Sequence, residues 1–120
     1  MATVAATETN FDQLTASEGI VLVDFWAAWC GPCRMFAPTF EAASQRHPEI
    51  TFAKVDTEAE PGLAARFGIM SIPTLMAFRD GILLFAQPGA LPAPALDDLI
   101  GQLVGLDMDQ VRAEVAKVNA

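Results

Sequence analysis

Apolar residues along this chain fall either in continuous runs or at helical spacing, and each pattern predicts a different element. Residues 20–25 are almost wholly apolar, and only Asp24 interrupts the run. Such a run predicts a strand that is buried on both faces, as in the centre of a parallel sheet. Residues 51–56 predict a second strand, and residues 3–6 are a candidate for another strand before both.

Two further apolar runs, residues 74–79 and 82–87, are separated by only two residues, Asp80 and Gly81. An Asp-Gly pair readily adopts the positive φ angles of a tight hairpin turn. The sequence therefore predicts an antiparallel hairpin in this region.

Two short helices are predicted from signals at their ends. Asn10 and Gln13 have the spacing of a capping box and Gly19 follows as a stop, so we expect a helix over residues 11–18. Residues 61–67 begin with a proline and are followed by a glycine, an asymmetry that is typical of a helix.

Two longer helices are predicted from apolar stripes. Residues 32–45 carry one stripe, and Pro38 within it lacks a backbone donor, which predicts a kink. A second stripe follows the hairpin, and we expect Asp97 and Asp98 in the first turn of that helix. The stripes consist of Phe36, Phe40 and Ala43, and of Leu96, Leu99, Ile100, Leu103 and Val104.

The end of the chain carries one more helical signal. Asp107 and Gln110 form another capping-box signature, and three valines beyond them share one helical face. These valines are Val111, Val115 and Val118. We expect a helix over residues 107–118 that packs back on the rest of the chain, and a surface for a partner or for self-association is the alternative.

The order strand, helix, strand, helix, hairpin and helix predicts an α/β sandwich around a mixed sheet. A chain of 120 residues is long enough for one domain and too short for two. We assign residues 1–106 to this domain, including an N-terminal segment, residues 1–8, with the candidate first strand. Residues 107–120 form the additional C-terminal amphipathic helix.

Composition narrows the classes of partner. Apolar residues make up 52% of the chain and charged residues 18%, which is typical of a globular protein. The formal net charge of −8 disfavours nucleic acid and anionic membrane surfaces as partners. No apolar run is long enough to cross a membrane and residues 1–10 lack the regions of a secretory signal, so we expect a cytoplasmic protein.

The only two cysteines, Cys30 and Cys33, lie where the buried strand is followed by a helix. Free backbone N–H groups and the dipole at a helix start favour an anion, such as a thiolate at Cys30. A thiolate attacks disulfides, and the second thiol is within reach to resolve the product. The alternatives are an inert buried pair or half of a zinc site, although with His47 as the only histidine the chain cannot complete a tetrahedral site.

Asp24 is an acid within the apolar strand. Burial of a carboxylate without a partner is costly, so the pKa of Asp24 should be raised. A base with a raised pKa is well suited to take a proton from a thiol.

These residues belong to a longer pattern. Residues 23–33, which contain the Trp29-Cys30-Gly31-Pro32-Cys33 segment, closely resemble the active-site segment of the thioredoxins. The match covers roughly residues 8 to 105, which makes it far more specific than two spaced cysteines. Its further positions are Pro38, Lys54, Ile72-Pro73-Thr74 and Gly89.

The resemblance implies the thioredoxin fold, an α/β fold with a central mixed five-stranded sheet flanked by four helices. It implies a protein-disulfide reductase that is recharged by an NADPH-dependent thioredoxin reductase and contributes to cell redox homeostasis. The partners would be this reductase and disulfide-containing client proteins. We expect a monomer that binds no metal and no cofactor and carries only a reversible Cys30–Cys33 disulfide.

The two cysteines receive distinct roles. Cys30 would be the attacking thiolate because it lies at the helix start, and Cys33 would be the resolving thiol. Gly31 and Pro32 would tune the pair toward a reductant, since the histidine that strongly oxidising relatives carry between their cysteines is absent.

The resemblance also assigns roles to two residues behind the cysteines. Asp24 would help to move the proton of Cys33 while the mixed disulfide is resolved. Lys54 on the adjacent strand would be the partner of this acid. A buried Asp–Lys pair with a purely structural role is the alternative.

A shallow apolar groove beside the thiols would receive the client. Pro73 would be the cis-proline of the family, rather than a trans proline that starts a strand, and the Ile72 backbone would pair with an extended client segment. Thr57 and Pro88 depart from the residue types usual at their positions and could alter which partners dock. The groove would be lined by Trp29, Thr57, Ser71, Ile72, Gly89 and Ala90.

Three other functions fit the residues less well. A non-catalytic binding or chaperone module is disfavoured by the intact cysteine pair, and an isomerase or oxidant by Gly31, Pro32 and Asp24. A glutaredoxin is disfavoured because its site commonly carries Pro-Tyr between the cysteines, which this chain lacks.

Overall fold

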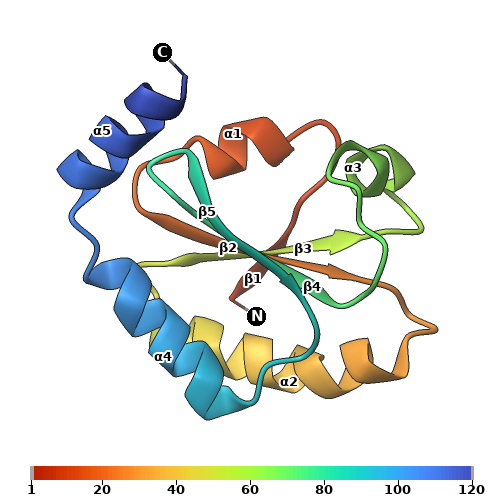
Figure 1. The fold of residues 1–120 in the computed structure, drawn as a ribbon. Coiled ribbons are helices and arrows are strands. Elements are labelled where there is room, and N and C mark those ends of the chain that lie inside the picture. Colours follow the sequence, from red (N-terminus) through yellow and green to blue (C-terminus); the bar gives the residue numbers. More distant parts are fainter. Residues whose placement is uncertain (1, 120) are drawn as a thin grey trace.

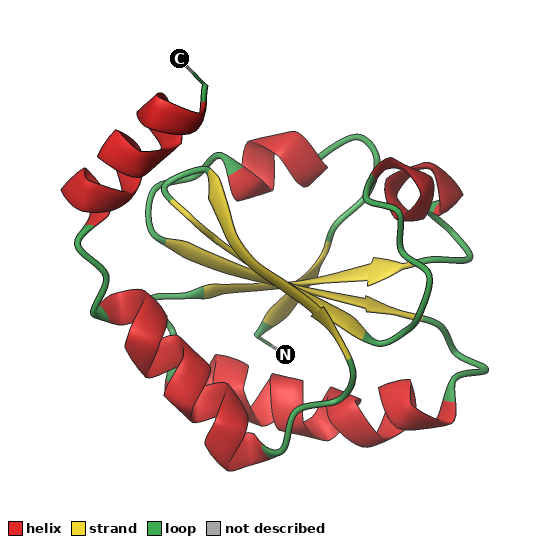
Figure 2. Ribbon diagram, in the orientation of Figure 1, coloured by secondary structure: helices red, strands yellow, loops and turns green. Residues whose placement is uncertain are grey.

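The computed structural model describes residues 2–119 and shows a five-stranded sheet with helices on both of its faces (Figures 1 and 2). The strand order is β1-β3-β2-β4-β5. The strands β1 (Thr3–Ala5), β3 (Thr51–Asp56) and β2 (Ile20–Trp26) are parallel. β4 (Thr74–Arg79) runs antiparallel to β2, and β5 (Ile82–Pro88) antiparallel to β4. The predicted mixed sheet, including its first strand, is confirmed.

Four helices cover the sheet in two pairs. α2 (Gly31–Arg46) and α4 (Ala93–Val104) lie on one face, and α1 (Phe11–Thr15) and α3 (Pro61–Arg66) lie on the other (Figure 1). α2 remains one continuous helix although Pro38 lies inside it. A fifth helix, α5 (Met108–Val118), follows α4.

The central strand β2 supplies residues to both hydrophobic cores. Val21, Val23 and Phe25 pack in the core on the α1 and α3 side, whereas Ile20 and Leu22 pack in the core under α2 and α4. Side chains alternate between the faces of a strand, so Asp24 shares the face of Ile20 and Leu22. This alternation turns Asp24 toward the helix that carries both cysteines.

The hairpin between β4 and β5 turns as predicted at Asp80 and Gly81. Both residues have positive φ angles, 53° and 82°, as a tight hairpin turn requires. The Gly19 N–H donates to Asp80 Oδ1 at 2.8 Å, which ties the turn to the start of β2.

The helix α1 starts at residue 11 as predicted, but its end and its cap differ from the prediction. The helix ends at Thr15 rather than at residue 18, and the Asn10 side chain does not cap it. Asn10 Oδ1 instead accepts from the Thr7 N–H at 2.7 Å, and Asn10 Nδ2 donates to the Ala5 carbonyl at 3.1 Å. A short polar side chain can bond to backbone on either side of it, and here the preceding loop provides the partners.

The predicted first turn of α4 is also wrong. The helix begins at Ala93, so Asp97 and Asp98 lie in its second turn. Pro94 occupies the true first turn, where a missing N–H leaves no helical bond unmade. The apolar stripe correctly predicted a helix here, but Asp97 and Asp98 did not mark its first turn.

The C-terminal helix forms as predicted and packs on the rest of the chain only in part. Asp107 caps α5 by accepting from the N–H groups of Asp109 and Gln110, as its signature predicted. Within α5 only Met108 is buried, Val111 and Val115 are half-buried and Val118 is 84% exposed, and Figure 1 shows the helix set apart from the sheet. Because its valines are only partly buried, docking of this helix on the domain recovers only part of the free energy that full burial of the valine face would give.

Polar contacts hold the base of α5. The Arg79 guanidinium donates to three backbone carbonyls, and Arg112 forms an ion pair with Asp80 at 3.6 Å. The carbonyls belong to Leu103, Val104 and Leu106, at the end of α4 and in the linker beyond it. The hairpin therefore anchors the linker from α4 to α5.

Candidate active site

Cys30 and Cys33 form a disulfide at the N-terminal end of α2. Cys30 is the N-cap residue with an extended backbone, and Cys33 lies in the first turn, with 5.2 Å between their Cα atoms. The Cys33 N–H donates to Cys30 Sγ at 3.2 Å, so the Cys30 sulfur occupies the position of a capping oxygen. A thiolate formed there is stabilised by this N–H and by the helix dipole.

The loop before β4 lies directly against Cys30. The Ile72–Pro73 peptide bond is cis, as the resemblance implied, and the Ile72 carbonyl oxygen lies 3.6 Å from Cys30 Sγ. The Gly89 N–H donates to the Pro73 carbonyl at 2.8 Å. Gly89 has a φ of +109°, a backbone angle that residues with a side chain rarely adopt. The Ile72 carbonyl thus lies at the Cys30 sulfur, and Gly89 holds the cis-proline loop from the other side of β4.

Asp24 lies fully buried on the face of β2 that α2 covers. Neither carboxylate oxygen has a hydrogen-bond partner among the described residues. Burial raises the pKa of Asp24 from 3.8 to about 7, and the positive charge of Lys54 opposes this rise. The carboxyl can therefore be charged or neutral near neutral pH, as a base that exchanges protons with a thiol requires.

Lys54 is the cross-strand neighbour of Asp24 in the register of β2 and β3. Its ammonium lies 4.9 Å from the centre of the Trp26 ring, and within residues 2–119 it forms no ion pair with Asp24. Lys54 therefore acts on the acid through its field rather than through a direct bond.

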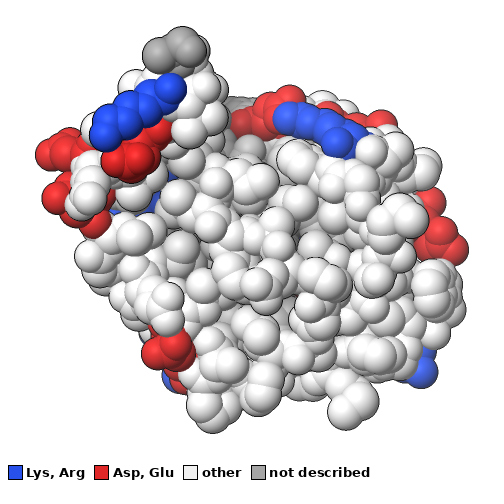
Figure 3. Space-filling model, viewed as in Figure 1, with Lys and Arg blue, Asp and Glu red and all other residues white. Residues whose placement is uncertain are grey.

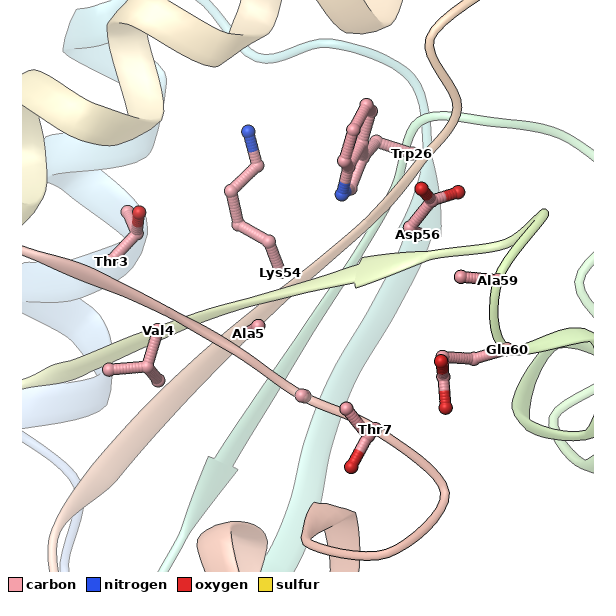
Figure 4. Close-up of a pocket in the computed structure, with 10 residues that line it drawn as sticks. Thr3, Val4, Ala5, Thr7, Trp26, Lys54, Asp56, Ala59 and Glu60 are labelled. Carbon is pink, nitrogen blue, oxygen red and sulfur yellow. The ribbon is translucent and has the colours of Figure 1, made fainter.

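A hollow of about 280 Å³ opens beside this group (Figure 4). β1 forms one wall, and Trp26, Lys54 and Asp56 contribute to the others. Trp26 Nε1 is buried without a hydrogen-bond partner in the described structure, and the Trp26 side chain packs against the cluster that contains both cysteines. Solvent in the hollow reaches Lys54 and Trp26, two neighbours of the buried acid.

A second hollow, of about 170 Å³, lies beside the disulfide on the side of α3. Four of the six predicted groove residues line it, and Gly89 and Ala90 do not. The four are Trp29, Thr57, Ser71 and Ile72. Ala64, Ile69 and Met70 complete the wall. We call this hollow the client groove.

Hydrogen bonds organise the rim of the client groove. Trp29 is 67% exposed, and its Nε1–H donates to Glu58 Oε1 at 3.1 Å, which holds the indole toward the β3–α3 loop. The Thr57 hydroxyl donates to the Trp26 carbonyl at 3.1 Å, so this polar departure from the family pattern has a backbone partner.

Comparison with known proteins decides what this arrangement is. A thioredoxin family model matches residues 2–102. A Streptomyces coelicolor protein described as "Putative thioredoxin 2" is 56% identical over 98% of this chain and 88% of its own length. Bacillus subtilis thioredoxin is 42% identical over 85% of this chain and 98% of its own. The chain belongs to the thioredoxin family.

A solved structure supports the same assignment. A single-site mutant of a thioredoxin from Halobacterium salinarum NRC-1 superposes with a TM-score of 0.78 and 34% identity, over 87% of this chain and 91% of that one. This thioredoxin is accordingly a thiol–disulfide oxidoreductase, and its Cys30–Cys33 pair performs thiol–disulfide exchange.

Two rim residues of this thioredoxin were not predicted from the sequence. Met70 lines the client groove and is 94% exposed, and Glu58 holds the Trp29 indole. Met70 directly precedes the predicted groove residue Ser71, and this adjacency was the one sequence feature that could have indicated its place on the rim. Glu58 had no comparable signal because its contact with Trp29 spans 29 residues.

The described structure offers neither a metal centre nor a membrane span. In the part of the chain that the structure describes, no three His, Cys, Asp or Glu side chains are grouped so that they could hold a metal ion. No helix within residues 2–119 is long and apolar enough to cross a membrane.

The face that carries β5 and the loop to α4 is poor in charge (Figure 3). Charged side chains gather on α5 and at the margins of the face shown in Figure 3, and its centre is uncharged. Residues 81–96, which contain β5 and the loop to α4, include no Lys, Arg, Asp or Glu. An uncharged surface costs less free energy to desolvate when a protein partner docks.

Proposed function

We propose that this thioredoxin reduces disulfides in client proteins, with Cys30 as the attacking thiolate and Cys33 as the resolving thiol. The observation that carries the assignment is the N-cap position of Cys30. Its sulfur accepts the Cys33 N–H at the positive end of α2, whereas Cys33 lies inside the first turn. The helix therefore stabilises negative charge on Cys30 more directly than on Cys33.

The first step joins one sulfur of the client disulfide covalently to Cys30. The Cys30 thiolate attacks one sulfur of the client disulfide, a mixed disulfide forms, and the other client sulfur leaves as a thiolate. The client segment would lie along Ile72, whose carbonyl is 3.6 Å from Cys30 Sγ, with its side chains in the client groove.

The second step releases the client. Cys33 loses a proton and attacks Cys30 Sγ, which re-forms the Cys30–Cys33 disulfide and frees the second client sulfur. Two electrons have then passed to the client. Asp24 is proposed to accept the Cys33 proton, because its pKa of about 7 leaves part of it ionised at neutral pH and it shares the strand face under α2.

After each cycle the Cys30–Cys33 disulfide must be reduced again. An NADPH-dependent thioredoxin reductase would return two electrons to the disulfide, so the chain itself would need no bound cofactor. A reducing compartment such as the cytosol would favour the dithiol form that attacks clients. We propose that the protein works as a monomer, with residues 1–106 as the catalytic domain and residues 107–120 as an added element.

Insulin reduction tests this function. The wild-type protein, with dithiothreitol or a reductase with NADPH as the electron source, should accelerate insulin precipitation, and Cys30→Ser should not. Cys33→Ser should accumulate mixed disulfides with its clients, since nothing resolves them. An inactive wild-type protein would refute the reductase function. Trapping by Cys30→Ser instead of Cys33→Ser would reverse the two roles.

A further inference from the structure

The described methionines fall into two groups by exposure. Met70 and Met35 are 94% and 78% exposed, whereas Met76 and Met108 are 3% and 7% exposed. A thioether is oxidised to a sulfoxide where a peroxide can reach the sulfur. Met70 and Met35 are therefore the two described methionines that are open to this chemistry.

Met70 lines two neighbouring hollows. It lines the client groove together with Trp29, and it also lines a hollow of about 220 Å³ that extends to Pro88. Two residues further on, Ile72 places its carbonyl oxygen 3.6 Å from Cys30 Sγ. A client segment that lies along Ile72 would pass beside the Met70 thioether.

Met35 provides a matched comparison within the same chain. It lies on α2, two residues after Cys33, and contributes to the lining of neither hollow. Oxidation at Met35 would change a surface side chain near the site without changing the groove.

We propose that Met70 is a peroxide modification site at which oxidation weakens client docking; this inference rests on the proposed function. The Met70 sulfur attacks one oxygen of a peroxide, the O–O bond breaks, and the sulfur gains that oxygen as a sulfoxide. The thioether loses two electrons, and the peroxide is reduced to water or to an alcohol. Methionine sulfoxide reductases reverse the change.

The sulfoxide alters the groove rather than the disulfide chemistry. Its strong S=O dipole is hydrated, and a client that covers it must remove that water or leave it poorly bonded. The flexible apolar contact that a thioether offers to varied clients is lost. In the disulfide form, Cys30 and Cys33 have no thiolate for the peroxide to oxidise, so Met70 can be modified selectively.

Peptide mapping by mass spectrometry tests the site. The disulfide form of the full chain is treated with hydrogen peroxide, and Met70 and Met35 should become sulfoxides well before Met76 and Met108. Oxidation of Met76 ahead of Met70 would overturn the assignment. This measurement does not depend on the reductase function.

Kinetics test the consequence. After removal of the peroxide, insulin reduction with dithiothreitol as electron source should show a KM raised about three- to fivefold, the scale of one lost apolar contact. Reduction of a small aromatic disulfide, which does not fill the groove, should keep its rate. Treatment with methionine sulfoxide reductases A and B should restore the original KM.

Three variants separate Met70 from the rest of the surface. Met70→Leu should show the same KM before and after peroxide, and Met70→Gln should show the raised KM without peroxide. Met35→Leu should match the wild type in both states. An unaltered insulin KM after complete Met70 oxidation, or an equal rise in Met70→Leu, overturns this inference. An untreated wild-type protein that fails to reduce insulin overturns the proposed function instead.

Discussion

Asp24 and Lys54 are register partners on β2 and β3, yet they form no ion pair within the described residues. The Lys54 ammonium lies 4.9 Å from the centre of the Trp26 ring, and both Asp24 oxygens lack a hydrogen-bond partner in that same part of the chain. Burial of the acid raises its pKa to about 7, and the charge of Lys54 only partly offsets this rise.

Asp24→Asn should stabilise the disulfide form at pH 8 and have little effect near pH 4. The pKa of Asp24 is about 7 in the folded state against 3.8 ordinarily, so the folded state binds a proton more tightly. The contribution of Asp24 to stability is therefore fully present below pH 3.8 and is lost as the pH rises to about 7. At about 1.4 kcal/mol per pKa unit, the loss is on the order of 4 kcal/mol. Urea unfolding at the two pH values measures it, and an equal effect at both would contradict the explanation.

Asp24→Asn should also slow the release of reduced client more than the initial attack. Asparagine cannot accept the Cys33 proton, whereas the attacking Cys30 thiolate is stabilised at the start of α2. In the wild type, the release rate should fall as the pH drops below about 7, because Asp24 becomes protonated. Stopped-flow measurement of both steps between pH 6 and pH 8 separates them (about one pKa unit on either side). Equal slowing of attack and release would refute the division of roles.

Lys54→Met should raise the pKa of Asp24 further. Methionine keeps an apolar stem of similar length beside Trp26 but removes the positive charge that favours the carboxylate. The carboxyl carbon of Asp24 in the disulfide form, followed by NMR titration, should show a midpoint above that of the wild type. Lys117→Met removes an equal charge from the exposed end of α5 and serves as the control. The same midpoint in Lys54→Met and Lys117→Met would disprove the field effect.

Removal of α5 should cost little stability and no activity. Met108 is the only buried residue of the helix, so truncation after Leu106 should lower the free energy of unfolding by about 1 to 2 kcal/mol. Figure 1 places α5 at the opposite end of the molecule from the start of α2, so insulin reduction should be unaffected. Urea unfolding and the insulin assay check both points. A truncated chain that does not fold would show that residues 1–106 are not an independent domain.

Much of the fold was predicted from local sequence patterns. The apolar run of β2, the Asp80–Gly81 turn and the Asp107 cap each depend on residues within a few positions of one another, and all three formed as predicted. The position of Cys30 at the start of α2 is equally local, since a strand followed by Gly31 and Pro32 places it there.

Competition between local partners limited the prediction at element ends. Asn10 had the spacing of a helix cap, but the loop before α1 offered its side chain other backbone groups. With Pro94 in its first turn, α4 begins at Ala93, three residues before Leu96, the first residue of the apolar stripe that predicted it. In both places several conformations satisfy the same residues, and the surrounding packing selects one.

By itself, the sequence determined the chemistry of this thioredoxin: two thiols at a helix start and an acid with a raised pKa inside the central strand. Only the tertiary structure decided which other residues contact these groups. It placed the Ile72 carbonyl at Cys30 Sγ, Met70 on the groove wall, the Lys54 ammonium over Trp26, and α5 away from the sheet. The physical reason is that hydrogen-bond spacing and helix dipoles act within a few residues, whereas these contacts join segments brought together by burial of the whole apolar core.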